Sequence, residues 1–476
     1  MWIGTVYGSP RDERSKSAPP LPPPSNADVG RSEVPRPAAI IGVLGALVLV
    51  VIDSAIANVA LPTIGRALAV SPAQSVLIVT AYQLGLVVAL LPSAALGESH
   101  GYRRVFVAGI MLFTSASVLC ALSPSLPVLV VARFVQGLGG SAIMWLSIAL
   151  LRQVVPQTRL GAAIGWHALT IALSSAAGPT IGAFILSALS WPWLFAVNLP
   201  IGATVLLLSR ALPHSAGSGQ RLDAISASLN AFVFGTFVFG AELLPSRPSL
   251  AAALLLGTAF GLTALIRREI PRQTPLIPID LLRAPSFRTS IIASVGCFTG
   301  QTAGFIALPF YLQHGLDQSA LTTGLLITPW PLTVAATAPI AGRLADRIPG
   351  AWITVAGCTA LATGLAGIAL WPHAGHPAVL VPFIMLCGFG FGLFQVSNNR
   401  NMFLTAPPHR SGAAGGIQGT ARLFGQTVGA VIVTLLFTLI SAERAPQVGL
   451  LIGDVLTLMA GMISARRLAL RSHLTH

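Results

Sequence analysis

The stretch AAIIGVLGALVLVVIDSAIANVAL, residues 38–61, decides the fold class, because Asp53 is its single charged side chain. A helix needs about 20 mainly apolar residues to cross roughly 30 Å of hydrocarbon at 1.5 Å per residue. A strand of a membrane barrel would be only about ten residues long and would alternate apolar with polar residues. The stretch therefore predicts a membrane-spanning α-helix.

The composition of the whole chain agrees with a membrane protein. Of its 476 residues, 54% are hydrophobic and 9% are charged, whereas soluble proteins average about 25% charged residues. The net charge of +14 would favour a nucleic-acid partner if the cations formed one patch. They lie instead in short segments between apolar stretches, so we expect the lipid bilayer, and no nucleic acid, as the partner of this chain.

Thirteen further apolar segments have the length of a membrane helix. The predicted spans after the first are 73–96, 104–122, 127–150, 162–187, 193–212, 225–245, 249–266, 290–313, 321–343, 351–371, 378–400, 412–440 and 448–466. The segment 249–266 is the shortest. The sequence thus predicts an all-α integral membrane protein with fourteen transmembrane helices.

The arginines predict the orientation of these helices. With the N-terminus on one side, that side's tails and loops carry 23 of the 28 cations, whereas the opposite loops carry Arg66, Arg247 and Arg444. Because cytoplasmic loops are enriched in Lys and Arg, both termini are expected in the cytoplasm of a cell whose inner or plasma membrane holds the protein. An even number of spans follows from this bias.

Two similar loops suggest that the chain is built from two related halves. AALGESHGYRR (residues 94–104) follows the second span, and AGRLADRIPG (residues 341–350) follows the tenth. Matching these loops divides the chain into two six-helix halves around an inserted helix pair. The predicted parts are a disordered, Pro-rich cytoplasmic tail (1–37), an N-terminal half (38–212), the inserted pair with its loops (213–289), a C-terminal half (290–468) and a cytoplasmic tail (469–476).

Charges within the predicted spans point to function, since an ionised side chain at the centre of a membrane helix costs about 2.5–3.5 kcal/mol. Asp53, Arg133, Arg422 and Asp454 are such residues. Asp53 and Arg133 are expected at equal depth, about 22 Å and 21 Å from the cytoplasmic face at 1.5 Å per residue. A proton-coupling pair and a fixed structural ion pair both fit this placement.

Several motifs together resemble the fourteen-span drug:proton antiporters of the major facilitator superfamily, the EmrB/QacA-type branch. The chain is similar to that branch over about residues 38–468. The motifs are VIDSAIANVALP (51–62), RFVQGLGG (133–140), GPTIG (178–182), WPWLFAVNLPIG (191–202), PFYLQ (309–313) and the loop at 341–350.

The resemblance implies the major facilitator fold, transport by alternating access, and roles for particular residues. Asp53 and Arg133 would couple substrate movement to protons. Residues that would control conformation are Gly97, Glu98, Gly101, Arg103, Arg104, Gly178, Pro179, Asp346 and Arg347. Residues expected to line a substrate cavity, from their depth in the predicted spans, are Asn58, Tyr82, Gln83, Gln136, Gln301, Trp330 and Arg422.

The sequence also departs from the branch that it resembles. Glu98 stands where an aspartate is usual, Ala94 where a glycine is usual, and Pro192 where an arginine is common. The predicted tenth span carries no acid, so a preference for dicationic drugs is not expected.

The expected function is export of amphiphilic drugs or other small organic compounds in exchange for protons. Dedicated export of one endogenous metabolite or self-made antibiotic is the alternative, and a non-transporting receptor is a third reading that would need a folded effector domain. No phosphate loop, catalytic serine motif or metal-spaced cluster occurs, so we expect no enzyme activity, cofactor or metal. The sequence is compatible with a monomer and leaves the oligomeric state open.

Overall fold

The computed structural model describes residues 37–214, 217, 219, 223–270, 279–371, 376–407 and 411–472, and the predicted tail 1–37 falls outside these residues except for Pro37. Every regular element in the described part is helical. Fourteen of the helical segments are long and apolar enough to cross a membrane. The predicted number and order of spans are therefore confirmed, and the shortest predicted segment, 249–266, is part of the 22-residue helix Pro248–Glu269.

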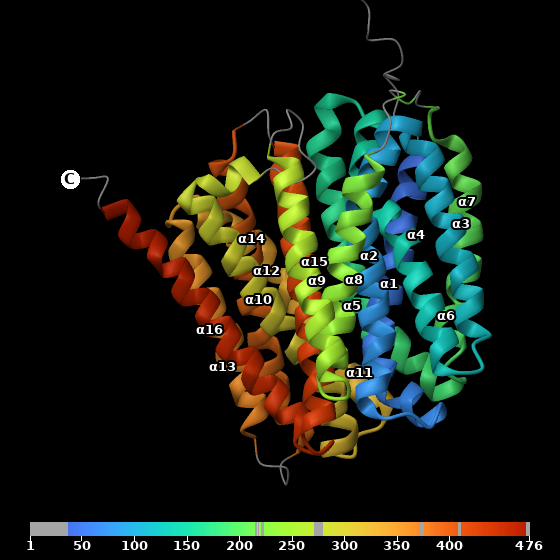
Figure 1. Cartoon of the computed structure of the whole chain (residues 1–476), viewed down its shortest axis with the longest axis vertical. Helices are drawn as coiled ribbons and strands as arrows, with labels where there is room; N and C mark the ends of the chain where they lie inside the picture. The colour runs from blue at the N-terminus through green and yellow to red at the C-terminus, as the bar shows by residue number, and fades with distance from the viewer. Residues whose placement is uncertain are drawn as a thin grey trace, which may run out of the picture.

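The helices form two bundles that lie side by side (Figure 1). The first bundle contains α1 (Pro37–Ala67), α2 (Pro72–His100), α3 (Tyr102–Ala121), α4 (Leu126–Val154), α5 (Leu160–Ala188), α6 (Trp193–Ala196) and α7 (Asn198–Leu208). The second contains α10 (Pro285–Phe310), α11 (Ala320–Ile327), α12 (Pro329–Ala345), α13 (Gly350–Ala369), α14 (Val381–Thr405), α15 (Ser411–Leu439) and α16 (Ala445–Ser472). The last helix extends past residue 468 because the residues that follow, ALRS, contain neither Gly nor Pro to end it.

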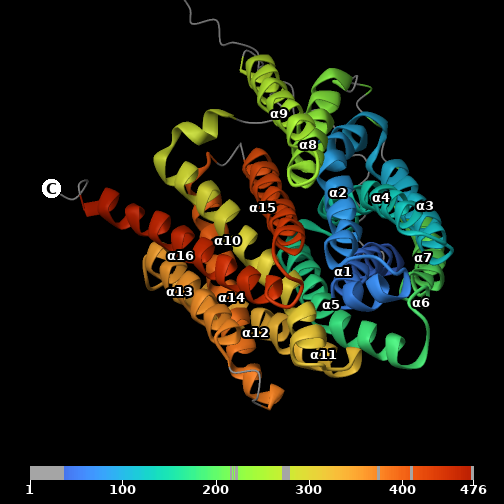
Figure 2. The same cartoon turned by 60° about the horizontal axis from the view of Figure 1, so that its bottom comes forward.

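A third group, the pair α8 (Ala224–Leu243) and α9 (Pro248–Glu269), lies at the edge of the molecule beside α2 and α15 (Figure 2). Asp223 caps the start of α8, since its carboxylate accepts a hydrogen bond from the backbone N–H of Ser226. Arg268 of α9 forms an ion pair with Asp223 at 3.1 Å and donates to the Ser226 hydroxyl. These contacts tie the first turn of α8 to the last turn of α9.

Prolines explain why one of the spans consists of two helical pieces. The tenth span is α11 followed by α12, and it breaks at Thr328 directly before Pro329. Pro329 and Pro331 lack a backbone donor, which interrupts the helical hydrogen bonds at this point, although Thr328 itself keeps a helical φ of −51° and ψ of −36°. At the break the Thr328 hydroxyl lies 2.6 Å from the hydroxyl of Thr180 on α5, so the interrupted span contacts the first bundle.

The arginine bias can be tested directly on this topology. We expect an alkaline phosphatase reporter, which is active only outside the cytoplasm, to stay inactive when fused after His476 and to be active when inserted at Ser246, between α8 and α9. A green fluorescent protein fused after His476 should fluoresce, which controls for expression. Phosphatase activity at the C-terminus would contradict cytoplasmic termini.

Candidate functional site

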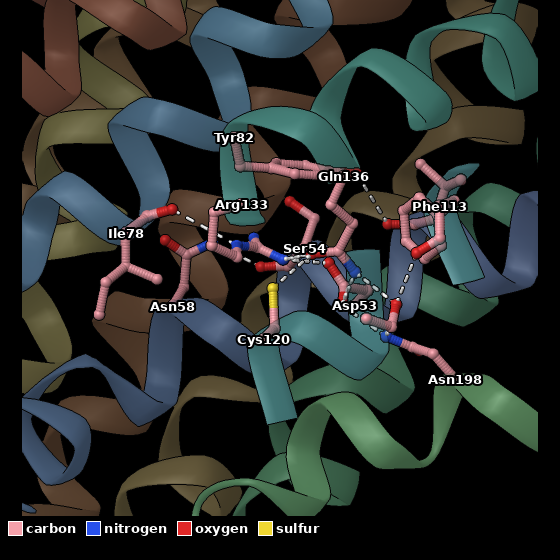
Figure 3. Close-up of polar contacts among 12 residues, drawn as sticks. Asp53, Ser54, Asn58, Ile78, Tyr82, Phe113, Cys120, Arg133, Gln136 and Asn198 are labelled. Carbon is pink, nitrogen blue, oxygen red and sulfur yellow. Dashed lines mark hydrogen bonds and ion pairs between the residues drawn. The ribbon is translucent and has the colours of Figure 1, made fainter. Parts of the chain in front are cut away.

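An ion pair between Asp53 of α1 and Arg133 of α4 lies deep inside the first bundle (Figure 3). Nη1 of Arg133 donates to Oδ2 of Asp53 at 2.5 Å, and both side chains are at most 1% exposed. The two residues predicted to share one depth therefore meet. Nε of Arg133 also donates to the backbone oxygen of Ile78 on α2 at 3.4 Å, so three helices converge on the guanidinium.

The second carboxylate oxygen of Asp53 is held by two amide groups. Oδ1 accepts hydrogen bonds from Nδ2 of Asn198 at 2.7 Å and from Nε2 of Gln136 at 2.9 Å. The Ser117 hydroxyl accepts from the same two amides, and Oε1 of Gln136 accepts from Nη1 of Arg133. An ionised carboxylate only accepts hydrogen bonds, so three donors on two oxygens suit the charged form.

Aromatic rings cover the guanidinium of Arg133. Its Cζ lies 4.2 Å from the ring centroid of Tyr82 and 5.5 Å from that of Phe195. Cation–π contacts of this kind contribute about 2 kcal/mol when water is excluded. The Cys120 thiol approaches Oε1 of Gln136 at 3.6 Å. The rings and the thiol complete a shell that buries the ion pair almost entirely.

Some members of this shell could not be identified from the sequence. Ser117 and Cys120 on α3 look like ordinary small residues of an apolar span, and their partners on other helices come from the packing of α3 against α4 and α7. Asn198 stands within the WPWLFAVNLPIG motif, which was the available signal, although the motif alone does not show that its amide reaches Asp53. Tyr82 and Gln136, which were expected to line a substrate cavity, contact the ion pair instead.

The other expected cavity residues are distributed over both bundles. Asn58 and Gln83 lie on α1 and α2, whereas Trp330 and Arg422 lie on α12 and α15. Each of these four has a buried polar atom without a hydrogen-bond partner among the described residues: Oδ1 of Asn58, Oε1 of Gln83, Nε1 of Trp330 and Nε of Arg422. Gln301, the fifth, accepts a hydrogen bond from Thr302 on α10. No described contact joins the five into one site.

The two similar loops have different partners. In the first, Gly101 takes a φ of 95°, which suits glycine, and connects α2 to α3. Arg103 extends to His214 at 2.7 Å, and Arg104 and Glu98 are exposed. Arg103 also donates to the backbone oxygen of Arg210 at 3.4 Å, so it ties this loop to the end of the sixth span.

In the second loop, Asp346 forms an ion pair at 2.9 Å with Arg400 at the end of α14. Arg347, next to it, is exposed. The Asp346 carboxylate is 69% exposed, and solvent-exposed ion pairs of this kind add little stability.

Helix α5 connects the ion pair to the second bundle. A Cβ atom at Gly178 would lie 2.3 Å from Cβ of Ala55, two residues from Asp53, so α5 and α1 pack as closely as glycine allows. On α11 of the second bundle, a Cβ at Gly324 would lie 2.6 Å from the backbone oxygen of Pro179 and 2.3 Å from Cβ of Ala183. A displacement of α5 would therefore change its contacts with α1 in the first bundle and with α11 in the second.

Among the described residues, no group of three His, Cys, Asp or Glu side chains could hold a metal ion. The four cysteines are buried and free. The charged groups at the centre of the site are one buried carboxylate and one buried guanidinium, Asp53 and Arg133.

Known proteins similar to this chain include membrane transporters. Residues 43–430 match the sequence profile of the Major Facilitator Superfamily. The "Uncharacterized transporter YebQ" of Escherichia coli (strain K12) is 42% identical over 91% of this chain and 96% of its own length. The "Multidrug resistance protein Stp" of Mycobacterium tuberculosis (strain CDC 1551 / Oshkosh) is 31% identical over 84% of this chain and 76% of its own length.

Solved structures at low sequence identity show the same fold. A POT family transporter bound to a thioalcohol-conjugated peptide superposes with a TM-score of 0.72 at 14% identity, covering 92% of this chain and 96% of the other. The xylose transporter XylE from E. coli, in a partially occluded inward-open conformation, gives 0.59 at 14% identity over 89% and 95%. With fourteen membrane-length helices in this fold and a family match over most of its length, the chain is a multi-pass membrane transporter that belongs to the Major Facilitator Superfamily.

Proposed function

We propose that this transporter is a proton-coupled antiporter of the fourteen-span branch, and that it exports amphiphilic drugs or other small organic compounds by alternating access. It would reside in the inner or plasma membrane with both termini in the cytoplasm. Substrate would leave the cytoplasm as protons enter.

The observation that carries this proposal is the buried Asp53–Arg133 pair. Ionisable residues inside membrane helices are costly, and they commonly mark ion pathways or proton relays. The pair is sealed in the described state, so a proton could reach Asp53 only after the helices rearrange. Gating of this kind is what coupled exchange requires, because a permanently open site would let protons leak.

The unpartnered polar atoms support a polar contribution to substrate binding. Asn58 and Gln83 come from the first bundle, and Trp330 and Arg422 from the second, so a substrate held between the bundles could meet both sets. Buried polar groups without partners are rare in native proteins, and a bound molecule or water would satisfy them. Apolar surroundings with few polar groups suit amphiphilic compounds.

The names of the relatives support export and also keep the alternative open. Besides Stp, a relative named "Drug efflux pump JefA" from Mycobacterium tuberculosis is 30% identical over 83% of this chain. A relative named "Riboflavin transporter RibZ" from Clostridioides difficile is 29% identical over 81% of it. The second name favours a transporter of one metabolite as the runner-up.

An efflux panel would separate the two candidates. We expect expression in a pump-deficient bacterium to raise the inhibitory concentrations of several chemically unrelated amphiphilic drugs, and to reduce their accumulation until a protonophore is added. Cells that carry the Asp53→Asn variant provide the matched control. Resistance to no drug, together with loss of one secreted compound on deletion in the native host, would favour the single-metabolite exporter. Efflux unaffected by the protonophore would contradict proton coupling.

A further inference from the structure

A pocket of about 300 Å³ lies outside the ion-pair site, on the side of the first bundle that the pair α8–α9 covers. Its walls are one face each of α2, α4 and α8. On α8 the lining residues Ala231, Gly235, Val238 and Glu242 recur at helical spacing over about 16 Å, at 1.5 Å per residue. The volume is at the lower end of the range for small-molecule sites, about 300–1,000 Å³.

The pocket opens toward the surroundings of the bundle. Val131 of α4 and Phe239 of α8 are 63% and 56% exposed, whereas Leu84 of α2 and Val238 of α8 are almost fully buried. In a membrane-spanning bundle such exposed apolar side chains face lipid. A ligand would therefore enter sideways from the bilayer.

One carboxylate gives the apolar pocket a polar end. Glu242 lies in the last turn of α8, and its Oε1 atom is buried without a hydrogen-bond partner among the described residues. Thr80, the other polar side chain of the lining, already donates to the backbone oxygen of Val76. Glu242 is thus the lining residue whose side chain carries a buried polar atom with no partner among the described residues.

The position of Glu242 sets the orientation of a ligand. Asn230, at the other end of the lined face of α8, donates to backbone oxygens of Val87 and Val88, which places that end near the middle of α2. Glu242 lies twelve residues further along α8, near the end of the span that the arginine bias places outside. An apolar tail would point to the membrane centre, and a polar head would reach the outer leaflet.

We propose that this pocket is a lateral binding site for a lipophilic amine, whose ammonium group pairs with Glu242 and whose apolar part fills the space between α2, α4 and α8. An amine and a carboxyl group form a strong hydrogen bond in a low dielectric. No lining residue is basic, so the phosphate of a phospholipid would find no counter-charge there. A free amine therefore fits better than a phospholipid headgroup. The site does not depend on proton-coupled export.

Photolabelling tests the proposal on the purified full-length transporter in phosphatidylcholine nanodiscs. The probe is dodecylamine that carries a diazirine in its alkyl chain, and labelled peptides are identified by mass spectrometry. We expect saturable labelling of α2, α4 and α8, with competition by dodecylamine at least tenfold stronger than by dodecanol. Glu242→Gln should weaken binding of the amine about tenfold or more and remove this preference, because a charge-assisted hydrogen bond is lost.

A substitution that fills the pocket gives an independent test. A Cβ atom at Gly235 would meet nothing within 4 Å, so Gly235→Leu should occupy the pocket and abolish labelling without disturbing the helix packing. The controls are Gly165→Leu, at a glycine of α5 that is equally unobstructed, and Glu443→Gln, at an exposed acid near the start of α16. Both should label like the wild type.

Labelling that dodecanol suppresses as well as dodecylamine does, and that Glu242→Gln leaves unchanged, would show an apolar lipid-chain site and overturn the proposal. Absence of saturable labelling on α2, α4 and α8 would overturn it as well. Because no gradient is applied, the outcome is independent of efflux. If the protein binds the amine but exports no drug, the lateral binding site is supported and the proposed export function is contradicted.

Discussion

Asp53→Asn is expected to abolish proton-driven efflux while substrate binding stays measurable. Asparagine keeps the shape of the side chain but cannot take up a proton in the working pH range, so the coupling step is lost. The measurement is drug uptake into inverted membrane vesicles under an imposed pH gradient, together with binding of the same drug to the purified protein. Glu443→Gln, at an exposed acid outside the site, is the matched control.

The single substitution also leaves a buried cation without its counter-ion. Arg133 is 1% exposed, and breaking a buried pair by removing one partner typically costs 3–5 kcal/mol. We therefore expect a lower abundance of the Asp53→Asn protein, and transport must be compared at equal amounts of folded transporter.

The neutral double variant Asp53→Asn/Arg133→Gln separates coupling from structure. Removing both charges together should recover part of the lost stability, since no buried charge is then left without its counter-ion. If Asp53 couples protons, the double variant exchanges substrate across the vesicle membrane but does not concentrate it under a pH gradient. Gradient-driven accumulation at the wild-type rate would show that the pair is only structural and that coupling occurs elsewhere.

The membrane helices were predictable because their physical requirement is simple. A span needs a minimum apolar length, and even the shortest span, Trp193–Ala211 with 19 residues, satisfies it. The meeting of Asp53 and Arg133 was predictable for a related reason: the fixed rise of a helix converts residue number into depth. Depth alone does not choose the neighbouring helix, and the resemblance to a known fold supplied that information.

Contacts made by small or neutral residues were not predictable in the same way. Ser117 and Asn198 are essential parts of the hydrogen-bond shell around Asp53, yet serine and asparagine in membrane helices have many possible partners. Glu242 lies three residues from the end of the predicted span 225–245. An acidic side chain near the end of a span has a small free-energy cost, so its position alone does not indicate a functional role. In each case the packing of helices far apart in the sequence decides the role.

The Gly178-Pro179 pair is a further case in which the sequence does not identify the packing partner. The resemblance gives these two residues a role in controlling conformation, and the structure adds the partner: glycine at 178 lets α5 approach α1 beside Asp53. Gly182, one turn further along, also faces α1, because its Cβ would lie 3.2 Å from Cγ2 of Ile56. The close approach therefore extends over at least one turn of both helices.

Gly178→Ala is accordingly expected to lower the rate of efflux at least tenfold at equal abundance of folded protein. A methyl group 2.3 Å from Cβ of Ala55 cannot be accommodated without separating α1 from α5, since real Cβ atoms do not approach so closely. The shift would displace the backbone that carries Asp53 relative to Arg133. The measurement is the initial rate of drug efflux from loaded cells.

Gly165→Ala is the control within the same helix, because a Cβ atom there meets nothing within 4 Å and the side chain faces outward. Alanine is the better helix former by about 1 kcal/mol, so this variant should fold and transport at least as well as the wild type. A loss of transport in Gly178→Ala but not in Gly165→Ala would then depend on the contact with α1 and not on helix propensity. Equal rates in both variants would mean that α1 and α5 separate without cost, and that α5 does not link Asp53 to the second bundle.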